Sequence, residues 1–389
     1  MKYMYVNTAA EIVNHRFTAP IIIYVSDVPT VLISDWNLSD GTDLIVEYDG
    51  NNNLVINEYI EDEFEGLKFT STGNSTVALT KSDSSAPTVD LKYSLDEGVT
   101  WTQWDFSVIS LNDGDTVCLK GLNTTFGSSD AYNYFEMTGS IAASGNIMSI
   151  IDDGACTTTT IPNDYCFIGL FNACHALTSA PELPATTLAK GCYAQMFYDC
   201  PALTAAPALP ATTLAKVCYY QMFYACTSLT TAPALPATTL ADYCYWSMFG
   251  TCTSLVTAPA LPATTLADSC YIDMFQNCTS LTTAPSILPA TTLADNCYHS
   301  MFAGCTSLTT APELPATTLT EHCYRGMFTN CVNLIYIKCL ATNISATNCT
   351  NGWMTAIHTS GTFVKAASMN DWTEGINGIP SGWIVQNAA

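Results

Sequence analysis

Cysteine is the residue type in this chain with the most evident capacity for chemistry, because 18 cysteines occur among 389 residues. Most of them form pairs in which the second cysteine follows the first by eight positions. Such a pattern indicates a role that recurs along the chain, as a disulfide, a metal site or part of a core. The first cysteines of the seven pairs are Cys166, Cys192, Cys218, Cys244, Cys270, Cys297 and Cys323.

Two chemical uses of these pairs fit the sequence poorly. On a helix, the members of a pair would be ~12 Å apart, beyond the roughly 7 Å limit for a disulfide. Equivalent cysteines of neighbouring units could lie about 5 Å apart, but a column of seven would leave one over. Zinc ligands stand two to four residues apart, and no C-x2-C occurs. We therefore expect small core residues stacked in columns, with pairing between units left open.

Other residue types offer no clear catalytic site. The five histidines are scattered, and the sequence contains no H-E-x-x-H, no G-x-S-x-G and no phosphate-binding glycine loop. Paired carboxylates of a glycoside hydrolase could stand in the N-terminal part, but no pair is singled out. We expect no catalytic residue, no bound metal and no cofactor.

The charged residues of the chain limit the classes of partner that it can bind. Charged residues make up 12% of the chain, against a usual share of roughly 25%, and the formal net charge is -23. Because no Lys or Arg occurs between Lys216 and Arg325, we exclude nucleic acid and disfavour an anionic membrane. The N-terminal residues lack the pattern of a secretory signal, and no apolar run is long enough for membrane insertion. We expect the chain to be made in the cytoplasm, where thiols stay reduced.

The cysteine pairs belong to a repeat of the form L-x-x-A-P-x-L-P-A-T-T-L-x-x-x-C-Y-x-x-M-F-x-x-C. Its step is 26 residues and becomes 27 once, in a loop between Ala284 and Pro289. In one unit, the extended piece from Leu229 ends before Pro233. Thr239 and Asp242 then have the spacing of a helix capping box.

The residues after this cap predict a short amphipathic helix. The apolar positions fall on one half of a helical wheel, and one strand, turn and helix cannot bury them without stacked copies. The sequence therefore predicts a solenoid. The apolar positions of the example unit are Leu240, Cys244, Tyr245, Met248, Phe249 and Cys252.

The repeat resembles the BspA-like leucine-rich repeats, which occur in surface proteins of gut and oral bacteria and in phage genomes. The resemblance covers Asp153 to Leu340, with Ala-Pro where the commoner form has an Ile in the strand. It implies a leucine-rich-repeat solenoid with a short strand and a short helix in each unit, in a right-handed horseshoe or ribbon. It also implies binding rather than turnover. The predicted fold class is α+β.

Four regions follow from these patterns. Residues 1–62 and 63–152 alternate short apolar runs with turn signals and are predicted to be β-rich modules, the second of them resembling a β-sandwich, that form one domain or two. Residues 153–338 are the solenoid of seven units. Residues 339–389, with three tryptophans, are predicted to cap its last apolar face.

One motif in the second module suggests an enzyme. The stretch Ser94-x-Asp96-x-Gly98-x-Thr100-Trp101 looks like the Asp-box of sialidases. Sialidases resemble one another in an arginine triad, however, and this chain contains only Arg16 and Arg325. The motif is better explained as a β-hairpin whose turn Asp and Gly close.

The varied positions of the repeat are the candidates for a partner-binding surface. Stacking would align the residues between Cys-Tyr and Met-Phe as a partly aromatic stripe, suited to anchoring a protein or stacking on a sugar. Drift without a function on a tolerant surface explains the same variation equally well. The candidate residues are Tyr220, Trp246, Ile272, His299 and Arg325.

These observations favour a non-enzymatic binding protein on a phage virion, as a tail or head appendage or decoration. In this hypothesis the N-terminal modules bind other virion or surface proteins, the repeats bind a bacterial surface protein or glycan, and an oligomer remains open. The alternative is a bacterial cell-surface adhesin of the same repeat family. A carbohydrate-active enzyme is the third hypothesis, and it depends on the Asp-box alone.

Overall fold

The computed structural model describes residues 64–388, and in the first 63 residues only the backbones of six strands. The chain divides into two compact units, Met1–Glu63 and Phe64–Ala389. The first unit contains a sheet in the order β1-β3-β4 and a second in the order β2-β5-β6. Its strands are β1 (Lys2–Val6), β2 (Arg16–Thr18), β3 (Ile21–Val25), β4 (Leu32–Ile33), β5 (Asp43–Tyr48) and β6 (Leu54–Glu58).

The second unit begins with two sheets that pack against each other. One has the order β10-β9-β12-β7-β14-β15 and the other β11-β8-β13, and Phe69 and Phe135 meet between them with ring centroids 5.0 Å apart. Alternating residues of β8 are buried, as expected for a strand with one face in the core. The strands are β7 (Lys68–Ser71), β8 (Ser75–Lys81), β9 (Lys92–Ser94), β10 (Thr102–Gln103), β11 (Ile109–Leu111), β12 (Thr116–Lys120), β13 (Asn133–Thr138), β14 (Ile141–Ser144) and β15 (Leu177–Ser179).

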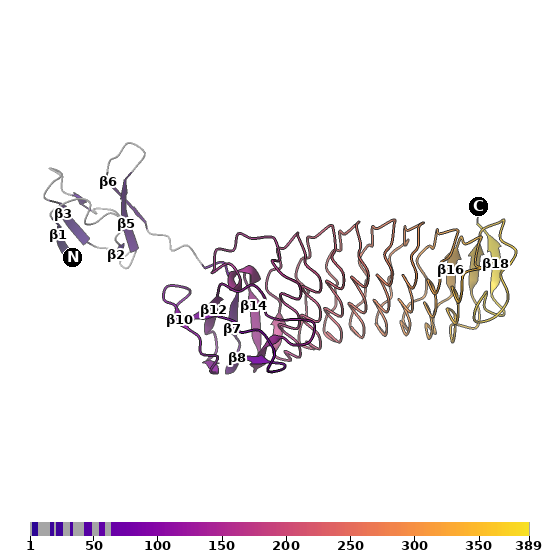
Figure 1. Cartoon of the computed structure of the whole chain (residues 1–389), viewed down its shortest axis with the longest axis horizontal. Coiled ribbons are helices and arrows are strands. Elements are labelled where there is room, and N and C mark those ends of the chain that lie inside the picture. The colour runs from indigo at the N-terminus through magenta and orange to yellow at the C-terminus, as the bar shows by residue number, and fades with distance from the viewer. Residues whose placement is uncertain are drawn as a thin grey trace. The chain divides into compact units, whose positions relative to one another are not determined.

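In the repeats, each unit forms one turn of the chain, here called a coil. The coils are stacked in a row that follows these sheets (Figure 1). The described residues contain no α-helix, and their helical structure is limited to one 3-10 turn, η2 (Ile147–Ile150). The predicted α+β class, with a short helix in each unit of the solenoid, is therefore wrong. The observed fold is almost entirely β and turn.

Backbone conformation explains why the helix does not form. Tyr243, Ser247 and Thr251 have φ values of 58°, 50° and 59°, in the left-handed region, whereas an α-helix needs φ near −60° at every residue. Positive φ values recur at the same spacing of four residues in the equivalent segments of the other units. A right-handed helix cannot continue through such positions.

Hydrogen bonding in these segments alternates between two directions. The N–H groups of Tyr245 and Phe249 donate to the carbonyls of Cys270 and Met274 in the next coil, both at 3.0 Å. Between them, the N–H of Met248 donates to the carbonyl of Tyr245, three residues back in its own coil (3.1 Å). Half of the backbone donors in the segment therefore join neighbouring coils.

The predicted capping box is also replaced by contacts between coils. Thr239 forms a parallel bridge with Thr213, and its carbonyl accepts the N–H of Leu214 (2.9 Å). Asp242 accepts a hydrogen bond from the Lys216 ammonium (3.3 Å). Both residues therefore make contacts between coils and do not cap a helix.

Two aromatic ladders run through the core along the stack. Neighbouring rings are 5.3–6.1 Å apart, and most are nearly parallel. The two packed sheets before the repeats are here called the β module, and the first ladder starts there, at Phe126. The first ladder contains Phe126, Phe167, Tyr193, Tyr219, Tyr245, Tyr271, Tyr298, Tyr324 and Trp353, and the second contains Phe171, Phe197, Phe223, Phe249, Phe275, Phe302 and Phe328.

The C-terminal segment adds a further coil and a small sheet. Tyr324 donates its N–H to the carbonyl of Cys349 (2.8 Å), and the positive-φ rhythm continues at Asn348, Gly352 and Ala356. Trp372 stacks on Trp353, with centroids 5.4 Å apart, and covers the end of the first ladder. The sheet consists of the parallel strands β16 (Tyr336–Cys339), β17 (Thr362–Lys365) and β18 (Ile384–Asn387).

Candidate functional site

The five residues predicted to bind a partner occupy one column across five successive coils. The carbonyls of Trp246, Ile272 and His299 each accept an N–H from the preceding coil, at 2.8–2.9 Å. This ladder holds the column in register, as the sequence predicted. Arg325 is exposed, and the other four side chains are half-buried. Their role in binding stays a prediction.

The N-terminal part of this column belongs to a larger cluster of rings, here called the aromatic patch: Tyr198, Tyr220, Tyr224, Tyr243 and Trp246. The rings of Tyr198 and Tyr224 stack at 5.1 Å. Trp246 lies 5.0 Å from Tyr220 and 5.5 Å from Tyr243. All five side chains are half-buried, so each presents part of its surface to solvent.

Only two members of the aromatic patch, Tyr220 and Trp246, are among the residues that the sequence predicts to bind a partner. Tyr198 and Tyr224 follow the Met-Phe dipeptide, outside the varied positions between Cys-Tyr and Met-Phe. Their spacing of four residues from Ala194 and Tyr220 could have indicated a shared face. A glycine also makes room for the cluster, because a Cβ on Gly250 would lie 2.8 Å from the ring of Tyr224.

Polar groups lie beside the rings. The Gln195 amide donates to the Gln221 side-chain carbonyl at 2.9 Å. Asp273 accepts from the Gln276 amide (3.0 Å). Burial raises the pKa of Asp273 to about 6, and a hydrogen bond from the Trp246 side chain opposes this rise. The aromatic patch is thus bordered by two amides and a partly desolvated carboxyl group.

Positive charge is sparse around the aromatic patch. Lys216 lies 5.6 Å from the ring centroid of Tyr243, but it also pairs with Asp242. Further along the column, burial lowers the pKa of His299, and Arg325 and His322 lower it further. His299 is therefore neutral at pH 7. The surface has little capacity to hold an anion.

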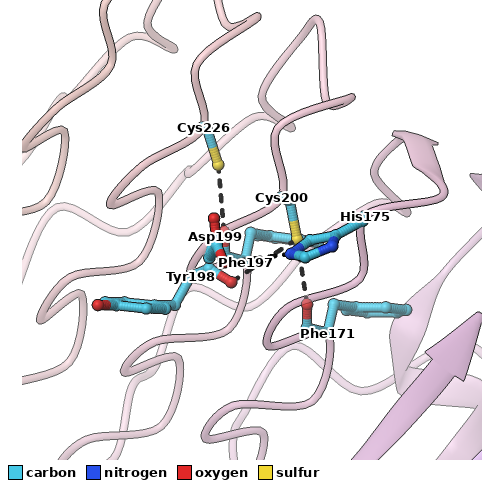
Figure 2. A network of polar contacts seen from close by, with 7 residues as sticks. All are labelled: Phe171, His175, Phe197, Tyr198, Asp199, Cys200 and Cys226. Atoms are coloured by element: carbon cyan, nitrogen blue, oxygen red, sulfur yellow. Dashed lines mark hydrogen bonds and ion pairs between the residues drawn. The ribbon is translucent and has the colours of Figure 1, made fainter.

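The paired cysteines are core residues, as predicted. The cysteines of the seven pairs carry free thiols and are buried. Figure 2 shows the thiols of Cys200 and Cys226 donating to the carbonyls of Phe171 and Phe197, both at 3.1 Å. Burial raises the pKa of the Cys226 thiol to about 12, so the reactive thiolate is rare at neutral pH.

Figure 2 also shows a contact between the side chains of His175 and Asp199. Their side chains approach to 3.1 Å and are both exposed. An exposed pair of this kind contributes little to stability. In residues 64–388, no group of three or more His, Cys, Asp or Glu side chains could hold a metal ion.

The Asp-box forms a closed turn between β9 and β10. Asp96 accepts from the Ser94 and Thr100 hydroxyls, both at 2.6 Å, and these bonds hold its pKa at about 2. Gly98 has a positive φ of 99° and donates its N–H to the Ser94 hydroxyl (2.8 Å). Trp101 packs edge-on against Phe64 at 5.0 Å. These contacts confirm the hairpin interpretation.

Comparison with known proteins gives no relative: no family model, no curated protein and no solved structure matches the chain. The described residues also include no helix with the length and apolar character needed to cross a membrane.

Proposed function

We propose that this chain is a non-enzymatic binding protein whose coils present the aromatic patch to a partner on a bacterial surface. The observation that carries the proposal is the clustering of five partly exposed Tyr and Trp rings on three successive coils. Tyrosine and tryptophan combine a large apolar surface with a polar tip, which makes them effective anchors.

The stack suits this role because it is rigid. Hydrogen bonds between coils hold the backbone on both sides of Trp246, from Gln221 to its carbonyl and from Ser247 to Ile272. A partner then binds a preformed surface and does not have to order it, which lowers the entropic cost of association.

We further propose a place on the surface of a phage virion, with the N-terminal unit bound to other virion proteins. The similarity of the repeat to BspA-like repeats is part of this proposal. Its physical support is the set of buried free thiols, some of which donate hydrogen bonds in the core. Such a core suits folding in a reducing cytoplasm, where virion proteins are made. A bacterial surface adhesin is the alternative.

Binding of the full chain to bacterial envelope fractions tests the first proposal. The double variant Tyr220→Ala/Trp246→Ala should lose at least tenfold in affinity. Tyr134→Ala, which removes a half-buried tyrosine from the β module, should bind as the parent does. Equal binding by all three proteins, or no binding by any, would contradict the proposal.

Immunogold labelling and mass spectrometry of purified phage particles test the location. The proposal predicts the chain on the particle surface. Detection in bacterial envelopes alone would favour the adhesin.

A further inference from the structure

We propose that the aromatic patch binds a neutral glycan. The inference rests on the proposed function and specifies the chemistry of its ligand. Sugar rings have apolar C–H faces and a rim of hydroxyl groups, so a site for them needs partly exposed aromatic rings with hydrogen-bonding groups beside them. The aromatic patch and its border supply both.

The aromatic part consists of rings held at fixed spacing on consecutive coils. The Tyr198–Tyr224 and Tyr220–Trp246 pairs each join neighbouring coils, with centroids 5.1 and 5.0 Å apart. Tyr243 extends the second pair at 5.5 Å from Trp246. The rings of the first pair are stacked nearly parallel and those of the second are tilted by 54°, so together they form a row of apolar ring surface along the stack axis.

The polar part matches hydroxyl groups rather than charged groups. Gln195 and Gln221 form an amide pair that uses one donor of the first and the acceptor of the second. The remaining amide hydrogens can donate to sugar oxygens. Asp273, at the other edge of Trp246, adds acceptor oxygens for sugar hydroxyls.

Charge argues against an anionic glycan. The net charge of the chain is -23, and no Lys or Arg occurs between Lys216 and Arg325. Phosphate, sulfate or uronate groups would therefore meet repulsion from an acidic chain, and Lys216, the basic side chain beside Tyr243, already pairs with Asp242. A neutral polysaccharide avoids this cost.

The composition of the surface also disfavours a protein ligand. The large hydrophobic side chains that are well exposed, such as Leu122, Val256 and Ile384, include none between Cys192 and Cys252. Protein interfaces are enriched in Arg and Met as well as in aromatic residues. Between Cys192 and Cys252 no arginine occurs, and the methionines Met196, Met222 and Met248 are buried.

The test uses polysaccharide extracted from bacterial envelopes, treated with protease and divided by anion exchange into neutral and anionic fractions. Binding of the full chain to each fraction is measured by affinity electrophoresis, and binding to intact envelopes is measured in parallel. We expect binding to the neutral fraction. Trp246→Ala should weaken it at least tenfold, whereas Tyr134→Ala, which removes a half-buried tyrosine outside the repeats, should change it less than twofold.

A second variant distinguishes the loss of a ligand contact from a folding defect. Gln221→Ala leaves every ring in place, and it should also weaken binding to the neutral fraction, by about threefold to tenfold, with an unchanged thermal midpoint. Binding to intact envelopes that depends on Trp246 but is absent from the neutral fraction would overturn the glycan inference and leave the proposed function standing. Envelope binding that does not depend on Trp246 would overturn both.

Discussion

At the scale of single residues, the two cysteines of a unit have different roles. In the second column the thiol donates to a carbonyl of the preceding coil, as in Cys252 to Phe223 at 3.0 Å. In the first column the bond between coils is longer, with the Cys244 sulfur 4.0 Å from the carbonyl oxygen of Cys270. Both thiols are fully buried. The second cysteine therefore makes the shorter hydrogen bond between coils, in addition to the packing that both provide.

This difference predicts that truncation of the two cysteines lowers the free energy of unfolding by different amounts. Cys252→Ala and Cys244→Ala remove the same atoms from equally buried sites, so their loss of packing should be similar. Cys252→Ala also removes the shorter of the two thiol hydrogen bonds, and a hydrogen bond is worth about 0.5–1.5 kcal/mol. Urea unfolding should show Cys252→Ala as the less stable variant, by no more than that margin. Equal midpoints would show that the thiol contact contributes nothing.

At the scale of the element, the coil is a unit that touches mainly its two neighbours. Its backbone donors, its rings and its thiols all reach the adjacent coil, as the bond from Tyr245 to Cys270 and the stacking of Phe249 on Phe275 illustrate. A structure with such nearest-neighbour coupling should tolerate the loss of one whole repeat.

Deletion of residues 253–278 tests this expectation. The deletion joins Cys252 to Thr279 and restores the sequence Cys-Thr-Ser at the junction. We expect a folded protein with cooperative urea unfolding and a smaller m-value, since less surface is buried.

Deletion of residues 253–265 is the control. It removes half a repeat and displaces both aromatic ladders from register, so the variant should unfold or aggregate. Similar behaviour of the two deletions would contradict the nearest-neighbour description.

At the scale of the whole molecule, the second unit has one continuous core from the β module to the C-terminal sheet. Phe126 starts one ladder within the β module, and Trp372 covers its other end. The β module and the C-terminal segment therefore close the two ends of the stack. The same core keeps a large set of thiols and tyrosine hydroxyls away from water.

This core predicts a loss of stability at alkaline pH. Burial raises the pKa of Cys226 and Cys278 from 9.0 to about 12, so above pH 9 the unfolded chain loses protons that the folded chain keeps. Their stabilising contribution is complete below pH 9 and is lost as the pH rises towards 12. The free energy of unfolding should fall by up to about 1.4 kcal/mol per pH unit for each such thiol.

Urea unfolding from pH 8 to pH 11 measures this slope. Cys278→Ala should have a shallower slope than the parent by about the share of one thiol. A free energy of unfolding that does not change between pH 9 and pH 11 would contradict the predicted protonation of the core.

The amino-acid sequence alone is enough to predict the repeat, its 26-residue step, the buried residues and the column of varied residues. The reason is that a stacked unit must repeat its core residues in register, and Cys244, Tyr245, Met248, Phe249 and Cys252 are indeed buried. The hairpin around Asp96 can also be predicted from the sequence, because its hydrogen bonds join residues close in sequence.

The backbone path of each unit could not be predicted from the sequence, because it depends on contacts between coils in the folded chain. Apolar residues at steps of one and four fit a helix of 3.6 residues per turn, and they fit a chain of four-residue turns just as well. Bonds to the next coil select the turns and hold residues such as Val217 and Thr251 at positive φ, which local preference disfavours. The aromatic patch depends on the same choice, because stacking brings Tyr198 to Tyr224 and Tyr220 to Trp246 across coils 26 residues apart.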